Sequence, residues 1–279
     1  MRKPLSQYHP ILYWLRVWQR RIGRYMVWYF GSRKFATQRQ ITQPLAYRYK
    51  KHTSKLIRRL GESDIQLQYN KVINLKLAVK QLTGIMIEPG HYFSFCRLVG
   101  RPTTRKGYVA GMQLSFGEAR SGIGGGICQI SNLIHWLALH SELQVVERAN
   151  HSFDPFPDEG RILPFGSGAA IFYNYIDLVL YNPTPKTFQI TLNVSEHQLE
   201  GELLCSEPRQ YSYHVYEQAH AFTRENGNTY RHNEIWRDVL TKYNVGDRPK
   251  CLSSTKLYQN HVVVKYPVAE GVIQTHEKS

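Results

Sequence analysis

Residues 121–139 constrain the fold of this chain more than any other segment. Glycine occupies four of the five positions from 122 to 126, just before Cys128. Behind the cysteine, apolar side chains recur at three- and four-residue spacing, which is typical of one buried helical face: Ile130, Leu133, Ile134, Leu137 and Ala138. The sequence therefore predicts a glycine-rich turn that places Cys128 in the first turn of a buried helix.

A thiol at this position has two interpretations. At a helix N-terminus, the macrodipole and the free N–H groups lower the pKa of a thiol and can hold an oxyanion. Cys128 is then a nucleophile, the N–H groups of residues 126–129 are oxyanion donors, and the predicted binding residues are Gly124, Gly125, Gly126 and Gln129. Alternatively, the cysteine is simply buried, in a turn that requires glycine for its geometry.

A thiol nucleophile needs a base and a group that orients this base. His151 follows the predicted helix, at the end of an apolar segment that predicts a strand. Asp177 lies within a second predicted strand, residues 170–181, and is the preferred orienting carboxylate. Asp154 and Asp158 are rivals because they are closer to the histidine in sequence, and the alternative for His151 is a loop or capping role. Cysteine on a helix, then histidine, then aspartate is the order found in papain-like and transglutaminase-like enzymes.

Four sequence blocks resemble the VanW family, which is named for an accessory protein of B-type vancomycin-resistance clusters. The blocks are PGHYFSF at residues 89–95, GIGGGICQ at 122–129, VERANHS at 146–152 and YIDL at 175–178. The likeness extends over most of the chain, which is similar to short family members without a membrane anchor. This resemblance implies a setting in the cell envelope, and it leaves the reaction and the substrate open.

The chain is basic, with 36 Lys and Arg against 21 Asp and Glu and a net charge of +15. Residues 11–30 predict a helix with a basic stripe at Arg16, Arg20 and Arg24 and apolar residues on another face. Such a helix either lies on an anionic membrane or packs on the main domain with its basic face in water. Its charges prevent it from spanning a bilayer or serving as a secretory signal. We expect a cytoplasmic protein, peripheral at the inner membrane face if the first interpretation holds.

Other partners and cofactors receive less support. A basic chain can bind nucleic acid, but no recognisable reading motif is present, so the sequence does not favour that partner. The glycine cluster lacks the Gly-Lys-Ser/Thr ending of a phosphate-binding loop. The cysteines, at positions 96, 128, 205 and 251, are scattered, which predicts free thiols and neither a zinc site nor a disulfide framework. We expect no cofactor and no metal.

The pattern along the chain predicts an α+β fold. Helices at residues 11–30 and 70–79 precede the glycine turn and a central helix, which packs on an antiparallel sheet. Alternating residues then predict two β-hairpins, at residues 188–205 and 211–235. We interpret the chain as a basic, aromatic N-terminal segment (residues 1–52), a VanW-like core (residues 53–182) and a β-rich C-terminal extension (residues 183–279).

Two classes of function remain open at this point. In the first, Cys128 attacks an amide or ester of a peptide or cell-wall precursor, His151 transfers the proton and Asp177 orients the imidazole. In the second, the same glycine-rich cleft binds an envelope component without turnover, as a binding or scaffold protein. Replacement of Cys128 by serine separates the two classes, because it abolishes turnover in the first and leaves binding intact in the second.

Overall fold

The computed structural model describes residues 9–58, 64–115, 118–151, 153–155, 157–158, 162–241 and 249–274. These residues form an α+β fold, as the sequence predicts. The helices are α1 (Pro10–Tyr29), α2 (Ile65–Leu82), α3 (Phe95–Val99) and α4 (Cys128–Leu139), with 3-10 turns at Thr104–Lys106 and Glu270–Val272. The strands are β1 (Tyr47–Lys55), β2 (Ile85–Ile87), β3 (Tyr92–Ser94), β4 (Ala110–Ser115), β5 (Glu118–Ile123), β6 (Gln144–Glu147), β7 (Phe153–Asp154), β8 (Val179–Tyr181), β9 (Phe188–Val194), β10 (Gln198–Cys205), β11 (Tyr211–Glu225), β12 (Asn228–Thr241), β13 (Cys251–Val264) and β14 (Ile273–Gln274).

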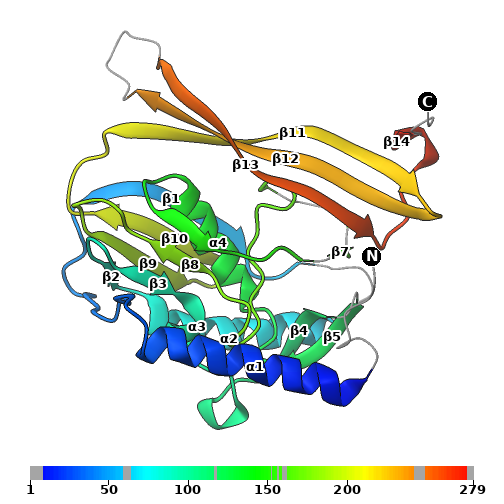
Figure 1. Cartoon of the computed structure of the whole chain (residues 1–279), viewed down its shortest axis with the longest axis horizontal. Helices are drawn as coiled ribbons and strands as arrows, with labels where there is room; N and C mark the ends of the chain where they lie inside the picture. The colour runs from blue at the N-terminus through cyan, green and yellow to red at the C-terminus, as the bar shows by residue number, and fades with distance from the viewer. Residues whose placement is uncertain are drawn as a thin grey trace.

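A four-stranded antiparallel sheet forms the centre of the molecule (Figure 1). Its strand order is β1-β10-β9-β2, and β9 and β10 form the hairpin predicted for residues 188–205. Strand β2 pairs with β9 and strand β1 pairs with β10. The sheet therefore joins strands from both sides of residue 182, and two strands of the interpreted C-terminal extension belong to this central sheet.

Helix α4 packs on this sheet, against β10 and β1, through the apolar face that the sequence predicts. The five residues of that face are at most 2% exposed. Burying one aliphatic side chain stabilises a fold by about 1.5–3 kcal/mol relative to leaving it in water, so this face is a main attachment of the helix. The helix begins at Cys128, as predicted.

Helix α2 packs against β9 on one side and β4 on the other. The predicted helical spacing of residues 70–79 is confirmed, and Leu75, Ala78 and Leu82 are fully buried. Three polar side chains of α2 are buried as well, namely Gln68, Lys71 and Asn74. They give the helix a polar stripe beside its apolar face.

The strand predicted for residues 170–181 is wrong over most of its length. Strand β8 forms at its end, between β3 and β6 in a three-stranded sheet, and residues 170–178 have no long strand. The carbonyl oxygens of Tyr173 and Asn174 accept hydrogen bonds from Arg21 and Arg24 of α1. The segment is largely apolar and is buried or partly buried, but it hydrogen-bonds to a helix with arginine donors rather than to another strand.

Strands β11, β12 and β13 form a long antiparallel sheet that arches over α4 (Figure 1). β11 and β12 confirm the second predicted hairpin, and β7 and β14 extend the sheet at its two edges. A small second core connects the long sheet to α4. In this core, Trp136 and Leu139 of α4 pack with Val215 of β11 and Ile235 of β12. The sheet thus closes the central domain on the side of α4.

Helix α1 runs along the side of the molecule opposite this long sheet (Figure 1). It confirms the helix predicted for residues 11–30. Arg24 forms a bidentate ion pair with Glu147, with one contact of 2.7 Å, and the side chain of Trp28 is buried in the core. None of the helices in the described part of the chain has both the length and the apolar character that crossing a membrane requires.

Candidate functional site

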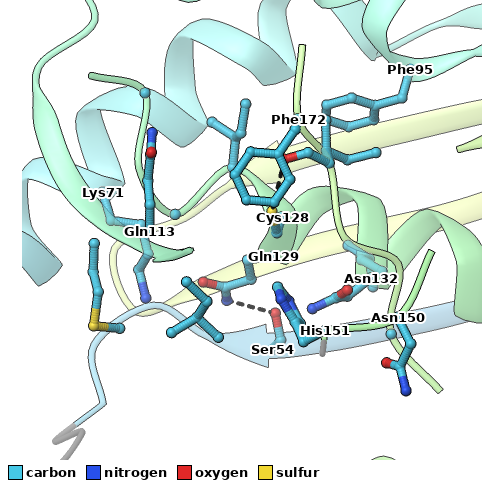
Figure 2. Close-up of a pocket in the computed structure, with 18 of the residues that line it drawn as sticks. Ser54, Lys71, Phe95, Gln113, Cys128, Gln129, Asn132, Asn150, His151 and Phe172 are labelled. Carbon is cyan, nitrogen blue, oxygen red and sulfur yellow. Dashed lines mark hydrogen bonds between the residues drawn. The ribbon is translucent and has the colours of Figure 1, made fainter. Parts of the chain in front are cut away.

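A cavity of about 550 Å³ lies between α2, the glycine turn, the start of α4 and the loop after β6. Figure 2 shows Cys128, Gln129 and His151 around this cavity, with Lys71 and Gln113 at its other side. The cavity therefore collects side chains that are far apart in the sequence, including two of the three predicted catalytic residues.

Close contacts with the neighbouring elements explain two glycines of the turn. Gly126 has a φ of +91°, and a Cβ there would lie 2.1 Å from Lys71 Cγ. A Cβ at Gly125 would lie 2.1 Å from the Gly111 backbone, while the Gly125 carbonyl accepts a hydrogen bond of 2.9 Å from Asn74 Nδ2. Only glycine permits both approaches. The turn is thereby fixed on α2 and β4, which sets the point where α4 begins.

Cys128 is half-buried at the edge of the cavity, and its thiol donates to the carbonyl oxygen of Ile171 at 3.8 Å. The expectation that the helix N-terminus lowers the thiol pKa is not met, because burial raises the pKa of Cys128 above its ordinary value. The N–H groups of Gln129 and Ile130 already donate to the carbonyl oxygens of residues 126 and 127. The cysteine is thus in the predicted place with a protonated thiol.

His151 lies in the loop between β6 and β7 and lines the same cavity. Burial and the nearby Arg148 lower the pKa of His151, so its imidazole is neutral at neutral pH. No described residue forms a hydrogen bond with it, and the Cys128 thiol has Ile171 as its partner instead. The structure therefore brings Cys128 and His151 to one cavity but does not join them by a hydrogen bond.

Asp177 lies outside the cavity and is fully buried. Its two carboxylate oxygens accept hydrogen bonds from Ser94 Oγ at 2.5 Å and from the Cys96 N–H at 2.8 Å. Burial raises the pKa of Asp177 to about 6. The carboxylate caps the start of α3 and ties it to the segment before β8. The structure does not bring Asp177 to His151.

The two rival carboxylates are engaged with one arginine. Asp154 lines the cavity and accepts hydrogen bonds from Arg231 Nη1 at 3.1 Å and from the Tyr266 hydroxyl at 2.9 Å. Asp158 pairs with the same guanidinium. Both carboxylates hold the loop after β6 against the long sheet, since Arg231 lies on β12.

Gln129 has a structural contact that its sequence position does not reveal. Its Nε2 donates to Ser54 Oγ at 2.8 Å and to the Lys55 carbonyl at 2.9 Å, as Figure 2 shows for the serine. These bonds tie the start of α4 to the end of β1. The amide oxygen of this predicted binding residue remains at the cavity.

Sequence reasoning missed the basic residues of the cavity. Lys71 is buried, donates to Gln68 Oε1 at 2.8 Å, and has its pKa lowered to about 8 by burial and by Arg58. Arg21 and Arg101 line the cavity too, and Arg21 Nε is buried without a hydrogen-bond partner among the described residues. The available signal was the three-residue spacing of polar residues on α2, beside its apolar face.

The charge of the cavity follows from this set. Among the lining residues that the structure describes, Asp154 is the one carboxylate, and it pairs with Arg231, which also pairs with Asp158. Basic side chains of α1, α2 and the neighbouring loops outnumber this carboxylate in the lining, among them Arg21, Lys71 and Arg101. The cavity is cationic, so its electrostatic field favours an anionic ligand.

One group of side chains outside the cavity has the ligand types of a metal site. Glu225, His232 and His261 lie on β11, β12 and β13, with ligand atoms within 4.8 Å of one another. The two imidazole rings stack with centroids 4.4 Å apart and an interplanar angle of 16°. In-plane lone pairs of nearly parallel rings do not point at one ion, so we assign no metal to this group. The four cysteines are free thiols, as the sequence predicts.

The fold and the cavity together define a class of α+β protein. In this class, a glycine-rich turn packs against α2 and places a cysteine, at the start of the next helix, at the edge of a cationic cavity. The family model described as VanW like protein matches residues 70–204. The chain is 32% identical over 271 residues to the vancomycin B-type resistance protein VanW of Enterococcus faecalis, an alignment that covers 97% of each chain. The chain therefore belongs to the VanW family, which confirms the resemblance seen in the sequence.

A second relative shares a shorter region. The chain is 35% identical over 89 residues to the uncharacterized protein YoaR of Bacillus subtilis, which corresponds to 32% of this chain and 29% of that protein. No solved structure matches this chain.

Proposed function

We propose that this protein binds an anionic component of the cell envelope in the cavity beside α4. The observation that supports it most strongly is Lys71, a lysine buried in the cavity wall whose visible partner is the neutral amide of Gln68. A buried ammonium without an anion is unfavourable, which explains why the pKa of Lys71 falls to about 8. A bound anion supplies the missing negative charge.

The ligand class follows from the rest of the lining. Amide side chains of Gln113, Gln129, Asn132 and Asn150 offer hydrogen bonds suited to peptide groups, and Phe172 offers an apolar surface. A short peptide with a free carboxylate combines these features. The cell envelope is the expected setting, in keeping with the resistance protein among the relatives.

Isothermal titration with matched peptides tests this proposal. The probes are N-acetylated dipeptides with a free C-terminal carboxylate, each compared with its C-terminal amide. We expect the carboxylate form to bind at least about tenfold more tightly, and Lys71→Met to remove that preference.

Lys76→Met is the matched control, because Lys76 lies on the exposed side of the same helix and its loss changes the net charge equally. Equal affinity for the acids and the amides would contradict the proposal. So would equal weakening by both lysine variants, since that result reports only the overall positive charge of the protein.

Thiol-dependent hydrolysis or acyl transfer is the second candidate function. The specific observation in its favour is that Cys128, at the start of α4, and a neutral His151 line one cavity. Catalytic hydrogen bonds are often incomplete without substrate, so ligand binding would have to bring the imidazole to the thiol. Ile127 and Cys128 N–H groups would then hold the oxyanion.

Mass spectrometry tests this candidate. The substrates are the same peptides with an ester or amide bond added at the C-terminal carboxylate. Turnover that Cys128→Ser abolishes while peptide binding is retained would establish the enzyme. If the peptides bind but are recovered unchanged, ligand binding is the only one of the two functions that is supported.

A further inference from the structure

Helix α1 exposes an apolar stripe along its length. Five residues at three- and four-residue spacing form it, and each exposes between 43% and 61% of its surface. We name this set the outer stripe: Ile11, Leu15, Trp18, Ile22 and Met26. Residues at this spacing share one face of a helix, so the exposed apolar surface is continuous rather than scattered.

The face of α1 that contacts the protein is unusually polar. Arg21 donates to the Tyr173 carbonyl at 3.1 Å, and Arg24 donates to the Asn174 carbonyl at 3.0 Å. Trp28 is the one apolar residue of the helix that is fully buried among those the structure describes. A surface helix normally buries its apolar stripe and exposes its charges. Here arginines face the protein and the apolar stripe faces outward.

The residues around the outer stripe indicate what covers it. Arg16 and Arg20 are exposed on α1 as well, on a different side of the helix from the outer stripe, and the whole chain has a net charge of +15. Trp14, Tyr25 and Tyr29 are exposed at its margins. Tryptophan and tyrosine favour the boundary between hydrocarbon and water, because each ring has an apolar body and a polar tip. Exposed arginines on a helix near an anionic lipid surface are attracted to its headgroups.

We propose that α1 docks on the surface of an anionic lipid bilayer, with the outer stripe in the boundary between headgroups and acyl chains. The helix lies parallel to the membrane, since its four arginines exclude a spanning orientation. The proposal does not depend on the function of the cavity. Because Arg21 both belongs to α1 and lines the cavity, docking holds the cavity near the lipid surface.

Vesicle flotation with the full chain tests the docking surface. We expect flotation with vesicles of phosphatidylcholine that contain about one quarter phosphatidylglycerol, and little with phosphatidylcholine alone. Binding should weaken as salt is raised, and Arg16→Gln/Arg20→Gln should flatten this salt dependence. Brominated lipids should quench the fluorescence of the exposed tryptophans on α1, because those rings enter the acyl boundary.

A triple variant of the outer stripe, Leu15→Gln/Trp18→Gln/Ile22→Gln, should weaken partitioning by about 100-fold. The matched control is Ile73→Gln/Leu252→Gln/Val272→Gln, which removes three apolar residues exposed by 46%, 50% and 55% elsewhere on the protein. This control should float like the unmodified chain. The melting temperature of both variants is compared, so that loss of binding is separated from loss of folding.

Three results would overturn the proposal. The first is equal weakening by the stripe variant and the control. The second is flotation without quenching by brominated lipids, since that would mean adsorption by charge alone. The third is a concentration-dependent dimer in analytical ultracentrifugation that the stripe variant dissociates, together with no flotation, because a second copy of the chain would then be the occupant.

Discussion

The side chain of Lys71 crosses Gly126 so closely that a Cβ at residue 126 would lie 2.1 Å from Lys71 Cγ. This contact joins the wall of the cavity to the turn that begins α4. It explains the glycine requirement of the turn by packing, and it also holds the lysine in a buried position. The architecture of the turn and the charge of the cavity therefore depend on the same pair of residues.

Gly126→Ala should lower the free energy of unfolding by about 2–4 kcal/mol. About 1 kcal/mol arises from the positive φ, and the rest from displacement of Lys71. Urea unfolding measures the effect. Gly90→Ala is the control, because Gly90 also has a positive φ, +72°, but an added Cβ there meets nothing within 4 Å. Equal losses in the two variants would show that the Lys71 contact is unimportant.

Affinity for the carboxylate peptides should fall as the pH rises above about 8. The pKa of Lys71 is lowered to about 8 by burial and by Arg58, and the protonated amine is the form that attracts an anion. Below this pH the amine is already charged, whereas above it binding must take up a proton, at a cost of up to about tenfold per pH unit. Titration calorimetry across pH measures this loss.

The same titration with Lys71→Met should show no step near pH 8. A persistent step in that variant would assign the titration to another group, and a flat profile in the unmodified protein would place the anion away from Lys71.

Asp177→Ala should destabilise the fold without changing the chemistry of the cavity. It leaves Ser94 Oγ and the buried Cys96 N–H without their acceptor, which costs about 2–3 kcal/mol of unfolding free energy. Alkylation of Cys128 by iodoacetamide should keep its rate in this variant. An unchanged stability together with a His151-dependent change in Cys128 reactivity would instead support the triad predicted from the sequence.

Local patterns predicted the features that depend on neighbours in the chain. The buried face of α4, the position of Cys128 at its start and both β-hairpins follow from spacing and turn residues. A carboxylate in an apolar segment, such as Asp177, needs a hydrogen-bonding partner when it is buried. Its partners, however, lie more than eighty residues earlier, at 94 and 96, and no sequence pattern selects them over His151.

Features that depend on packing between distant segments could not be predicted in this way. Residues 170–178 are largely apolar and are buried or partly buried. Their sequence does not reveal that arginines of α1 donate hydrogen bonds to two of their carbonyl groups. The raised pKa of Cys128 is a second case, since the helix N-terminus favours the thiolate and only the tertiary burial reverses it. Lys71 is a third, because a lysine on a helix is ordinarily exposed.

The pH dependence of iodoacetamide alkylation at Cys128, with and without His151→Ala, separates ligand binding from thiol catalysis most directly. Mass spectrometry reads each site, and the exposed Cys251 is the internal reference. Burial raises the pKa of Cys128 above its ordinary value of 9.0, and its thiol donates to the Ile171 carbonyl instead of to His151. Cys128 should therefore react only at high pH, and His151→Ala should not alter its rate. Rapid reaction below about pH 8 that His151→Ala removes would contradict a purely ligand-binding cavity and would establish a thiolate–imidazole pair.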